Sequence, residues 1–174
     1  MTKGKSEGLG TYAELMPKEV WTEVYPNLWI GGTDEDDIVG KPEIEPRITK
    51  QDFDTVVTLH AWSNPVDWYV REIRQHFQDG EVTEFNEEDL NFLVELVCYE
   101  LELGKNVLIR CLSGLNRSGL LTTMVLMRYG YSAEETIAHL REKRSKLVLC
   151  NKDYEKWLLD KEMETKEKEK EVEN

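Results

Sequence analysis

The residue types and spacing that could support chemistry gather in one segment, where Cys111 and Arg117 are separated by five residues. A cysteine acts as a nucleophile in its thiolate form, which nearby positive charge and backbone N–H groups stabilise. An arginine offers two parallel N–H donors to a phosphoryl group, which a lysine cannot do. Gly114 lies between them and permits the positive φ that a tight loop needs. The segment therefore predicts a nucleophilic cysteine in a loop that binds phosphate.

The flanking sequence predicts the elements that would hold this loop. Residues 106–110 have the pattern of a buried strand, and residues 117–129 form an apolar helical pattern that ends at Gly130. A loop between a strand and a helix N-terminus turns several N–H groups toward one point, and the helix dipole adds positive potential there. Gly119 lets the start of this helix pack closely. The predicted phosphate-binding residues are Leu112, Ser113, Gly114, Leu115, Asn116 and Arg117.

Upstream of the loop, apolar and β-branched segments predict the rest of a sheet. Residues 22–30 read as two short strands around Pro26-Asn27, and residues 55–60 as a buried strand. Asn64-Pro65 favours a turn into a helix that runs through Arg74, and residues 76–78 could form one more short strand.

Helical spacing and capping residues predict the other helices. A helix is expected over residues 87–103, capped by Asn86, and another from Ser132 through about Arg144. Asn151 is expected to cap a last helix that begins near residue 152. Strands first alternate with helices, and helices then dominate. The pattern predicts an α/β fold with a central, mostly parallel sheet flanked by helices.

Length and composition bound the organisation of the chain. Its 174 residues fit one domain, which we divide into an N-terminal extension (1–19), a domain (20–160) and a charged tail (161–174), the tail being either a solvated helical extension or disordered. Three cysteines without a close pair predict free thiols, and three distant histidines predict no metal site. The net charge of −13 disfavours a nucleic-acid partner. The chain lacks a membrane span and an apolar leader, so a cytoplasmic location is expected.

The loop resembles the signature His-Cys-x5-Arg-Ser/Thr of the protein tyrosine and dual-specificity phosphatases. Cys111, Arg117 and Ser118 match this signature, and Gly114 falls on the family's usual glycine. Tyr25-Pro26-Asn27-Leu28-Trp29-Ile30-Gly31 resembles the family's opening strand, and residues 143–158 resemble its closing pair of helices. The resemblance thus covers about residues 20–160 and implies the sandwich fold of the protein tyrosine phosphatases.

The resemblance also implies a reaction. Phosphomonoesters on tyrosine, serine or threonine of a phosphorylated protein or peptide would be hydrolysed through a phosphocysteine, without metal or cofactor. Cys111 would attack phosphorus, Arg117 and the loop amides would hold the phosphoryl oxygens, and Ser118 would hydrogen-bond the departing thiolate. The family's general acid lies on an upstream loop, a place that Asp79 occupies here. Asp79-Gly80 is also a common turn pair, and the alternative acids are Glu81, Glu84 and Asp89.

One departure from the signature keeps other functions open. Arg110 stands where the family has a histidine that helps to order the loop and tune the thiol. Arg110 could compensate as a cation, or it could point to the other face of its strand. A phosphate-binding pseudophosphatase is therefore one alternative. RNA 5′-triphosphatase activity is another, because residues 114–119 resemble the Gly-x-Asn-Arg-Thr-Gly of RNA-directed members, although the net charge counts against it. Phosphoinositide hydrolysis is a third, although the loop lacks the extra lysines of such members.

Overall fold

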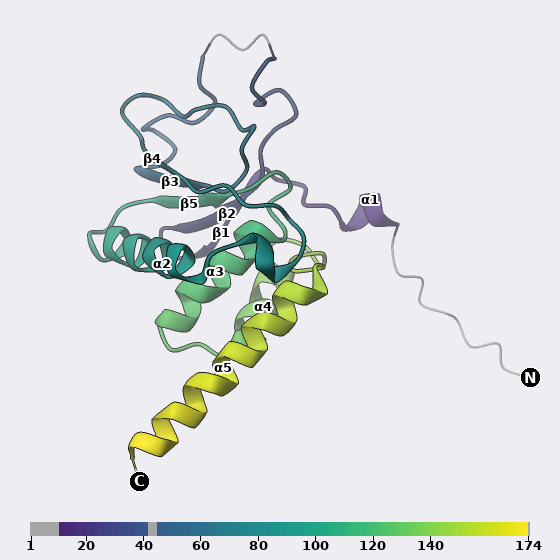
Figure 1. The fold of residues 1–174 in the computed structure, drawn as a ribbon. Coiled ribbons are helices and arrows are strands. Elements are labelled where there is room, and N and C mark those ends of the chain that lie inside the picture. The colour runs from purple at the N-terminus through teal and green to yellow at the C-terminus, as the bar shows by residue number, and fades with distance from the viewer. Residues whose placement is uncertain (1–10, 42–44, 174) are drawn as a thin grey trace, which may run out of the picture.

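The computed structural model describes residues 11–41 and 45–173, and its centre is a mixed sheet of five strands (Figure 1). The strand order is β1-β2-β5-β3-β4. Strands β1 and β2 pair antiparallel, and all the other pairs are parallel. The strands are β1 (Trp21–Tyr25), β2 (Leu28–Gly31), β3 (Thr55–Thr58), β4 (Arg71–Arg74) and β5 (Val107–Arg110). The predicted α/β fold with a mostly parallel sheet is confirmed.

The central strands end level with one another, which sets the place of the site. Arg110 at the end of β5 is in register with Gly31 of β2 and Thr58 of β3. All four residues of β3 and of β5 are buried, as expected for apolar, β-branched strands in the middle of a parallel sheet. The loop that follows β5 therefore emerges between the carboxyl ends of two neighbouring strands, where α/β sheets commonly bind ligands.

Helices cover one face of the sheet (Figure 1). They are α2 (Glu87–Glu102), α3 (Arg117–Arg128), α4 (Ala133–Lys143) and α5 (Lys152–Val172). The main hydrophobic core lies between this face and the helices, with Val57 and Ile109 from the sheet and Leu120, Leu121 and Tyr154 from the helices. A short helix α1 (Tyr12–Leu15) and a 3₁₀ turn η1 (Val82–Glu84) complete the elements.

Loops rather than helices cover the other face. Val56 of β3 and Leu108 of β5 point into a second, smaller core with Ile48, Phe53 and Val70 from the connecting segments. Side chains alternate along a strand, so Arg110, two residues after Leu108, lies on this loop-covered face. Cys111, by contrast, belongs to the core on the helical face.

The helix boundaries agree with the capping residues in the sequence. Asn86 accepts hydrogen bonds from the amides of Glu88 and Asp89, Ser132 forms a capping box with Glu135, and Asn151 accepts from the amide of Asp153.

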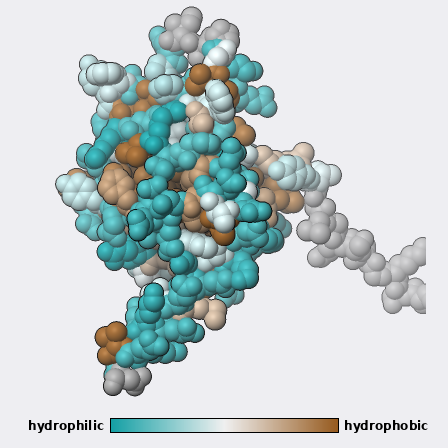
Figure 2. Space-filling model, in the orientation of Figure 1, coloured by the Kyte–Doolittle hydropathy of each residue, from teal (hydrophilic) through white to brown (hydrophobic). Residues whose placement is uncertain are grey.

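Helix α5 continues through the charged tail to Val172, so the helical alternative for these residues is the one found. Figure 2 shows this projecting part as mostly hydrophilic surface. The division into extension, domain and tail stays a prediction.

Two local predictions are wrong. No helix follows Asn64-Pro65; the segment is irregular and ends in the edge strand β4, which pairs with β3. Specific contacts override the helical pattern there, because the Asp67 amide donates to Ile48 O at 2.8 Å and the Asp67 carboxylate accepts from the Tyr69 amide at 3.0 Å. Residues 76–78 form no strand, because their carbonyls accept from side chains: Phe77 O from Arg117 Nη1 at 3.0 Å and Gln78 O from the Tyr154 hydroxyl at 2.8 Å. Among the described helices, none is long and apolar enough to cross a membrane.

Candidate active site

The predicted nucleophile lies at the bottom of a loop at the carboxyl end of the sheet. Cys111 directly follows β5 and is 2% exposed. Its Sγ lies 3.3 Å from the hydroxyl Oγ of Ser118, which is buried in the first turn of α3. The loop joins a buried strand to a helix N-terminus, as the sequence predicts. A hydroxyl at this distance can donate a hydrogen bond to the sulfur of a thiolate.

Five successive carbonyls of the loop are held from outside it. Their partners come from two segments distant in sequence, the residue after Gly31-Gly32 and the stretch between α4 and α5. The bonds run from Thr33 Oγ1 to Cys111 O (2.9 Å), from Thr33 N to Leu112 O (2.8 Å), from Arg144 Nη2 to Ser113 O (3.3 Å), from Arg144 Nε to Gly114 O (2.7 Å) and from Leu149 N to Leu115 O (3.1 Å).

This arrangement turns the amides of the loop inward. In a planar trans peptide the C=O and the following N–H point in opposite directions. Each carbonyl drawn outward therefore aims the next amide at the centre of the loop, which applies to residues 112–116. In the described part of the chain, none of the amides of residues 112–117 donates to a protein acceptor. Converging N–H groups at a helix N-terminus form an anion site without a metal.

Arg117 is buried beside these converging amides, and only some of its N–H groups have a hydrogen-bond partner among the described residues. Its Nη1 donates to Phe77 O at 3.0 Å and more weakly to Leu59 O at 3.4 Å, which fixes the guanidinium against the end of β3. Its Nε is buried and has no hydrogen-bond partner among the described residues. A buried guanidinium with an unused donor is suited to bind an anion of fixed geometry.

Asp79 lies over the rim of the loop. Its Oδ2 accepts from Asn116 Nδ2 at 3.0 Å, and its Oδ1 accepts from Asn151 Nδ2 at 3.1 Å. Asn151 also donates from the same nitrogen to Gly80 O at 2.8 Å, and its amide donates to Asn116 Oδ1 at 2.9 Å. A loop residue and the N-cap of α5 thus hold the carboxyl group in place.

The three alternative acids lack this connection. Glu81 accepts from Thr83, and Asp89 accepts from Gln75 at 3.2 Å. Among the described residues, no hydrogen bond or ion pair joins Glu81, Glu84 or Asp89 to residues 111–117. Of these four acids, Asp79 is the one that a hydrogen bond joins to the loop, through Asn116.

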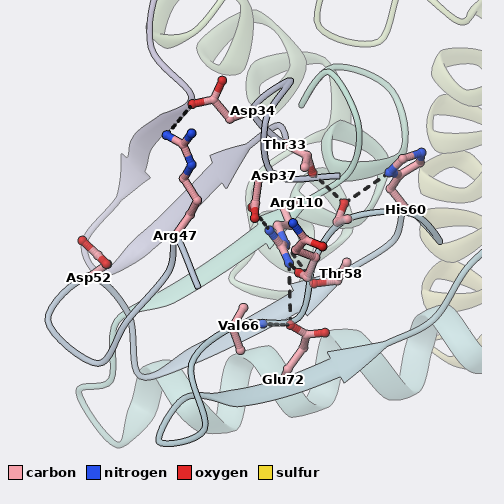
Figure 3. A network of polar contacts seen from close by, with 12 residues as sticks. Thr33, Asp34, Asp37, Arg47, Asp52, Thr58, His60, Val66, Glu72 and Arg110 are labelled. Atoms are coloured by element: carbon pink, nitrogen blue, oxygen red, sulfur yellow. Dashed lines mark hydrogen bonds and ion pairs between the residues drawn. The ribbon is translucent and has the colours of Figure 1, made fainter. Parts of the chain in front are cut away.

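Arg110 points into the loop-covered face, where its guanidinium lies among Asp37, Thr58 and Glu72 (Figure 3). It is 1% exposed, and its guanidinium donates to Asp37 Oδ2 at 3.0 Å, Asn64 O at 2.6 Å and Thr58 Oγ1 at 3.0 Å. Burial lowers the pKa of Arg110, while the negative charges of Glu72 and Asp37 oppose that effect. Of the two possibilities left open by the sequence, the structure shows the one in which Arg110 lies on the opposite face.

A second arginine, Arg144, performs a role at the loop that the sequence did not reveal. Besides the two loop carbonyls, it donates to Val20 O at 3.2 Å and to Thr22 Oγ1 at 2.9 Å. Burial lowers its pKa to about 10, and the negative charge of a Cys111 thiolate opposes this shift. Arg144 is thus still a cation at neutral pH and lies behind the loop.

The sequence also missed Thr33 and the second role of Asn151. The sequence predicts Asn151 only as a helix cap and Arg144 only as the end of a helix. Thr33 follows Gly31-Gly32 in a polar loop, and no spacing or motif distinguishes it.

Gly114 is required by both conformation and space. Its φ is +69°, and an added Cβ would lie 2.4 Å from the carbonyl carbon of Gly31 and 2.5 Å from Nη2 of Arg144. We expect Gly114→Ala to lower the free energy of unfolding by more than about 2 kcal/mol, through strain and overpacking. Gly104→Ala is the matched control, because Gly104 has φ +72° but nothing within 4 Å, so it should lose only about 1 kcal/mol. Urea unfolding measures both; equal losses would show that the contacts of Gly114 do not matter.

The cysteines of this chain, Cys98, Cys111 and Cys150, are free thiols. Within the residues described, no group of three or more histidine, cysteine, aspartate or glutamate side chains is placed to hold a metal ion.

Comparison with known proteins gives a consistent result. The sequence model for the catalytic domain of dual specificity phosphatases matches residues 43–164. Among curated proteins, none is similar enough in sequence to count as a match.

Solved structures share the fold at low sequence identity. Human DUSP28 is 17% identical with a TM-score of 0.69, covering 87% of this chain and 99% of its own. A mouse putative dual specificity phosphatase in complex with zinc tungstate is 20% identical with a TM-score of 0.66, covering 94% and 96%. Tk-PTP in its active form is 22% identical with a TM-score of 0.64, covering 84% and 98%.

Proposed function

This chain belongs to the dual specificity phosphatases by its catalytic domain, and from that premise we propose that it hydrolyses phosphomonoesters on protein tyrosine, serine or threonine through a phosphocysteine intermediate. The observation that carries the proposal is the loop of residues 111–117, whose amides converge above a buried thiol and beside a partly unpartnered guanidinium. A binding protein could use the amides and the arginine, but it would have less need of a nucleophile and an acid.

In the first half of the proposed reaction the thiolate of Cys111 attacks phosphorus in line. The amides of residues 112–117 and the guanidinium of Arg117 bind the three equatorial oxygens, on which negative charge spreads in the transition state. Asp79 gives its proton to the leaving oxygen as the P–O bond breaks. The products of this step are the free alcohol or phenol and the phosphocysteine.

In the second half a water molecule attacks the phosphocysteine. Asp79, now a carboxylate, takes a proton from this water, and the S–P bond breaks to release inorganic phosphate. Ser118 donates a hydrogen bond to the departing sulfur, for which its distance of 3.3 Å is suitable. The cycle needs no metal and leaves Asp79 protonated for the next substrate.

The proposal predicts a specific effect of Asp79→Asn. We expect kcat to fall about 10²- to 10³-fold on phosphoserine and phosphothreonine peptides, whose leaving groups need a proton, and less on p-nitrophenyl phosphate. Only protonated Asp79 can act as the acid, so the alkaline limb of the bell-shaped pH profile should disappear. Steady-state kinetics across pH check both effects.

Glu84→Gln is the control for this prediction, since Glu84 lies on the same segment without a polar contact to the loop within the described residues. It should leave the rate and both limbs of the profile unchanged. Full activity of Asp79→Asn would assign the acid elsewhere.

A substrate panel tests the proposed function as a whole. Wild-type protein is assayed with p-nitrophenyl phosphate, phosphopeptides, inositol phospholipids and 5′-triphosphorylated RNA. We expect turnover of the phosphopeptides and of p-nitrophenyl phosphate. Preference for an inositide or for RNA would move the substrate class within the family. Binding of phosphate without turnover of any substrate would contradict the enzyme and favour a pseudophosphatase.

A further inference from the structure

Arg110 leaves the task of holding the nucleophile's peptide to other side chains, and the structure provides a chain of hydroxyls for it. Thr33 Oγ1 lies 2.9 Å from Cys111 O and 2.6 Å from Oγ of the buried Ser63. Ser63 Oγ in turn lies 3.2 Å from Nδ1 of His60. Figure 3 labels Thr33 and His60, the two side chains that lie on either side of this hydroxyl. Four groups from three segments thus form one continuous path that ends on the peptide of Cys111.

The hydrogen bonds of this path can be donated in only one direction, from His60 toward the carbonyl of Cys111. A carbonyl oxygen can only accept, so the single hydroxyl proton of Thr33 is donated to Cys111 O. Ser63 must then donate its proton to Thr33, and His60 must donate from Nδ1 to Ser63. The neutral imidazole is thereby fixed in the tautomer that carries its proton on Nδ1.

The buried Arg110 holds the two loops that carry this path. Through Asp37 it binds the segment that contains Thr33, and through Asn64 O it binds the residue next to Ser63. The Asn64 amide also donates to Asp37 O at 2.8 Å, which joins the two loops directly. Arg110 therefore acts on the catalytic loop from a distance, by fixing the segments that contact it.

We propose that Thr33, oriented by Ser63 and His60, is a positioning residue for Cys111. By drawing the Cys111 carbonyl outward, Thr33 aims the amide of Leu112 at the sulfur and at the bound phosphoryl group. Loss of this hydroxyl frees the peptide to rotate and weakens the N–H that favours the thiolate. Its importance for turnover rests on the proposed function, whereas its effect on the thiol does not.

The charges around His60 keep this path in one protonation state at assay pH. Burial lowers the pKa of His60 to about 4, and electrostatic interactions with Arg117 at the start of α3, Arg110 at the end of β5, Arg74 at the end of β4 and His76 just after β4 lower it further. Because its pKa lies below neutrality, His60 is uncharged above about pH 5 and the path acts through dipoles alone.

The test replaces the hydroxyl and measures the thiol itself. In Thr33→Val, a variant of nearly equal shape, we expect alkylation of Cys111 by iodoacetamide near pH 6 to slow roughly five- to tenfold, as for the loss of one hydrogen bond. The rates should converge with those of wild type at high pH, where every thiol is ionised. The acid limb of kcat/KM should move to higher pH by the same amount, and Thr33→Ser should restore both.

Thr165→Val is the matched control, since the hydroxyl of Thr165 donates to Lys161 O at 3.0 Å on the exposed part of α5. It should change neither the alkylation profile nor activity. A folded Thr33→Val with an unchanged alkylation profile would overturn the proposal, even if the protein turned over none of the substrates. If all substrates fail while Thr33→Val shifts the alkylation profile, the proposed function falls and the positioning role stands.

A measurement on wild-type protein keeps the proposal testable if Thr33→Val does not fold. The ring ¹⁵N chemical shifts of His60 at neutral pH should report a proton on Nδ1. A proton on Nε2 would reverse the last bond of the path and overturn the proposed role of His60. Ser63→Ala should shift the alkylation profile in the same direction as Thr33→Val but by less, because Thr33 keeps its bond to Cys111 O.

Discussion

Replacing Cys111 with serine is expected to lower kcat by about 10⁴-fold or more on every substrate that the wild-type protein hydrolyses. The amides of the loop and Arg117 can stabilise a thiolate, whereas a serine hydroxyl there stays protonated and attacks phosphorus poorly. The amides and Arg117 are untouched, so binding of substrate and of inorganic phosphate should change little. Steady-state kinetics and calorimetric titration with phosphate measure the two properties separately.

Cys98→Ser is the control for this variant, because Cys98 is a buried thiol of α2 and no hydrogen bond joins it to residues 111–117 in the described part of the chain. Cys98→Ser should lower the free energy of unfolding and leave kcat unchanged. Trapping supplies a second criterion: acid quench during turnover should yield a protein phosphorylated on Cys111 in wild type and none in Cys111→Ser. Activity in Cys111→Ser near the wild-type level would assign the nucleophile to another residue.

Arg117→Lys is expected to lower kcat/KM by roughly 10³-fold although it keeps the positive charge. Lysine cannot offer two parallel donors to the equatorial oxygens, and it cannot at the same time reach Phe77 O, to which Arg117 Nη1 donates. That bond also ties the guanidinium to the segment that carries Asp79. The loss should therefore be greater in kcat than in phosphate affinity, which steady-state kinetics and phosphate titration separate.

Arg128→Lys is the matched control for Arg117→Lys. Arg128 lies at the other end of the same helix and pairs with Glu95 at 2.8 Å on the exposed surface. Its replacement should alter neither activity nor the unfolding midpoint appreciably, since exposed ion pairs contribute little. Should Arg117→Lys retain activity within a few-fold of wild type, the guanidinium would only support the fold.

The sequence predicts the centre of this site better than its surroundings. Cys111, Gly114 and Arg117 are found from local spacing, because strand, loop and helix follow one another in the chain and their geometry is set locally. Asp79 is found only by resemblance and by its place before a long helix. Its selection over Glu81, Glu84 and Asp89 depends on Asn116 and Asn151, which fold against it from 37 and 72 residues away.

The partners of the loop carbonyls could not be predicted either, because they too are distant from the loop in sequence. Thr33 and Arg144 lie 78 and 30 residues from the loop atoms that they bind, and neither belongs to a local motif. The wrong helix before Arg74 has a related origin, since the pairing of β4 with β3 is a tertiary interaction that local preference does not contain. The fold class was predictable because alternation of strands and helices is a property of the whole chain.

The outward-held carbonyls also bear on how a substrate arrives. Peptide dipoles act over a few ångströms, whereas the net charge of −13 acts over about 10 Å at 0.1 M salt. At lower ionic strength this range is longer, so the acidic side chains of the whole protein repel a phosphorylated ligand before it comes close enough to contact the loop. Raising the ionic strength weakens the repulsion and leaves the final contacts nearly intact, so encounter should quicken with salt. By the same reasoning, a phosphate flanked by basic residues would be captured faster than one in an acidic segment.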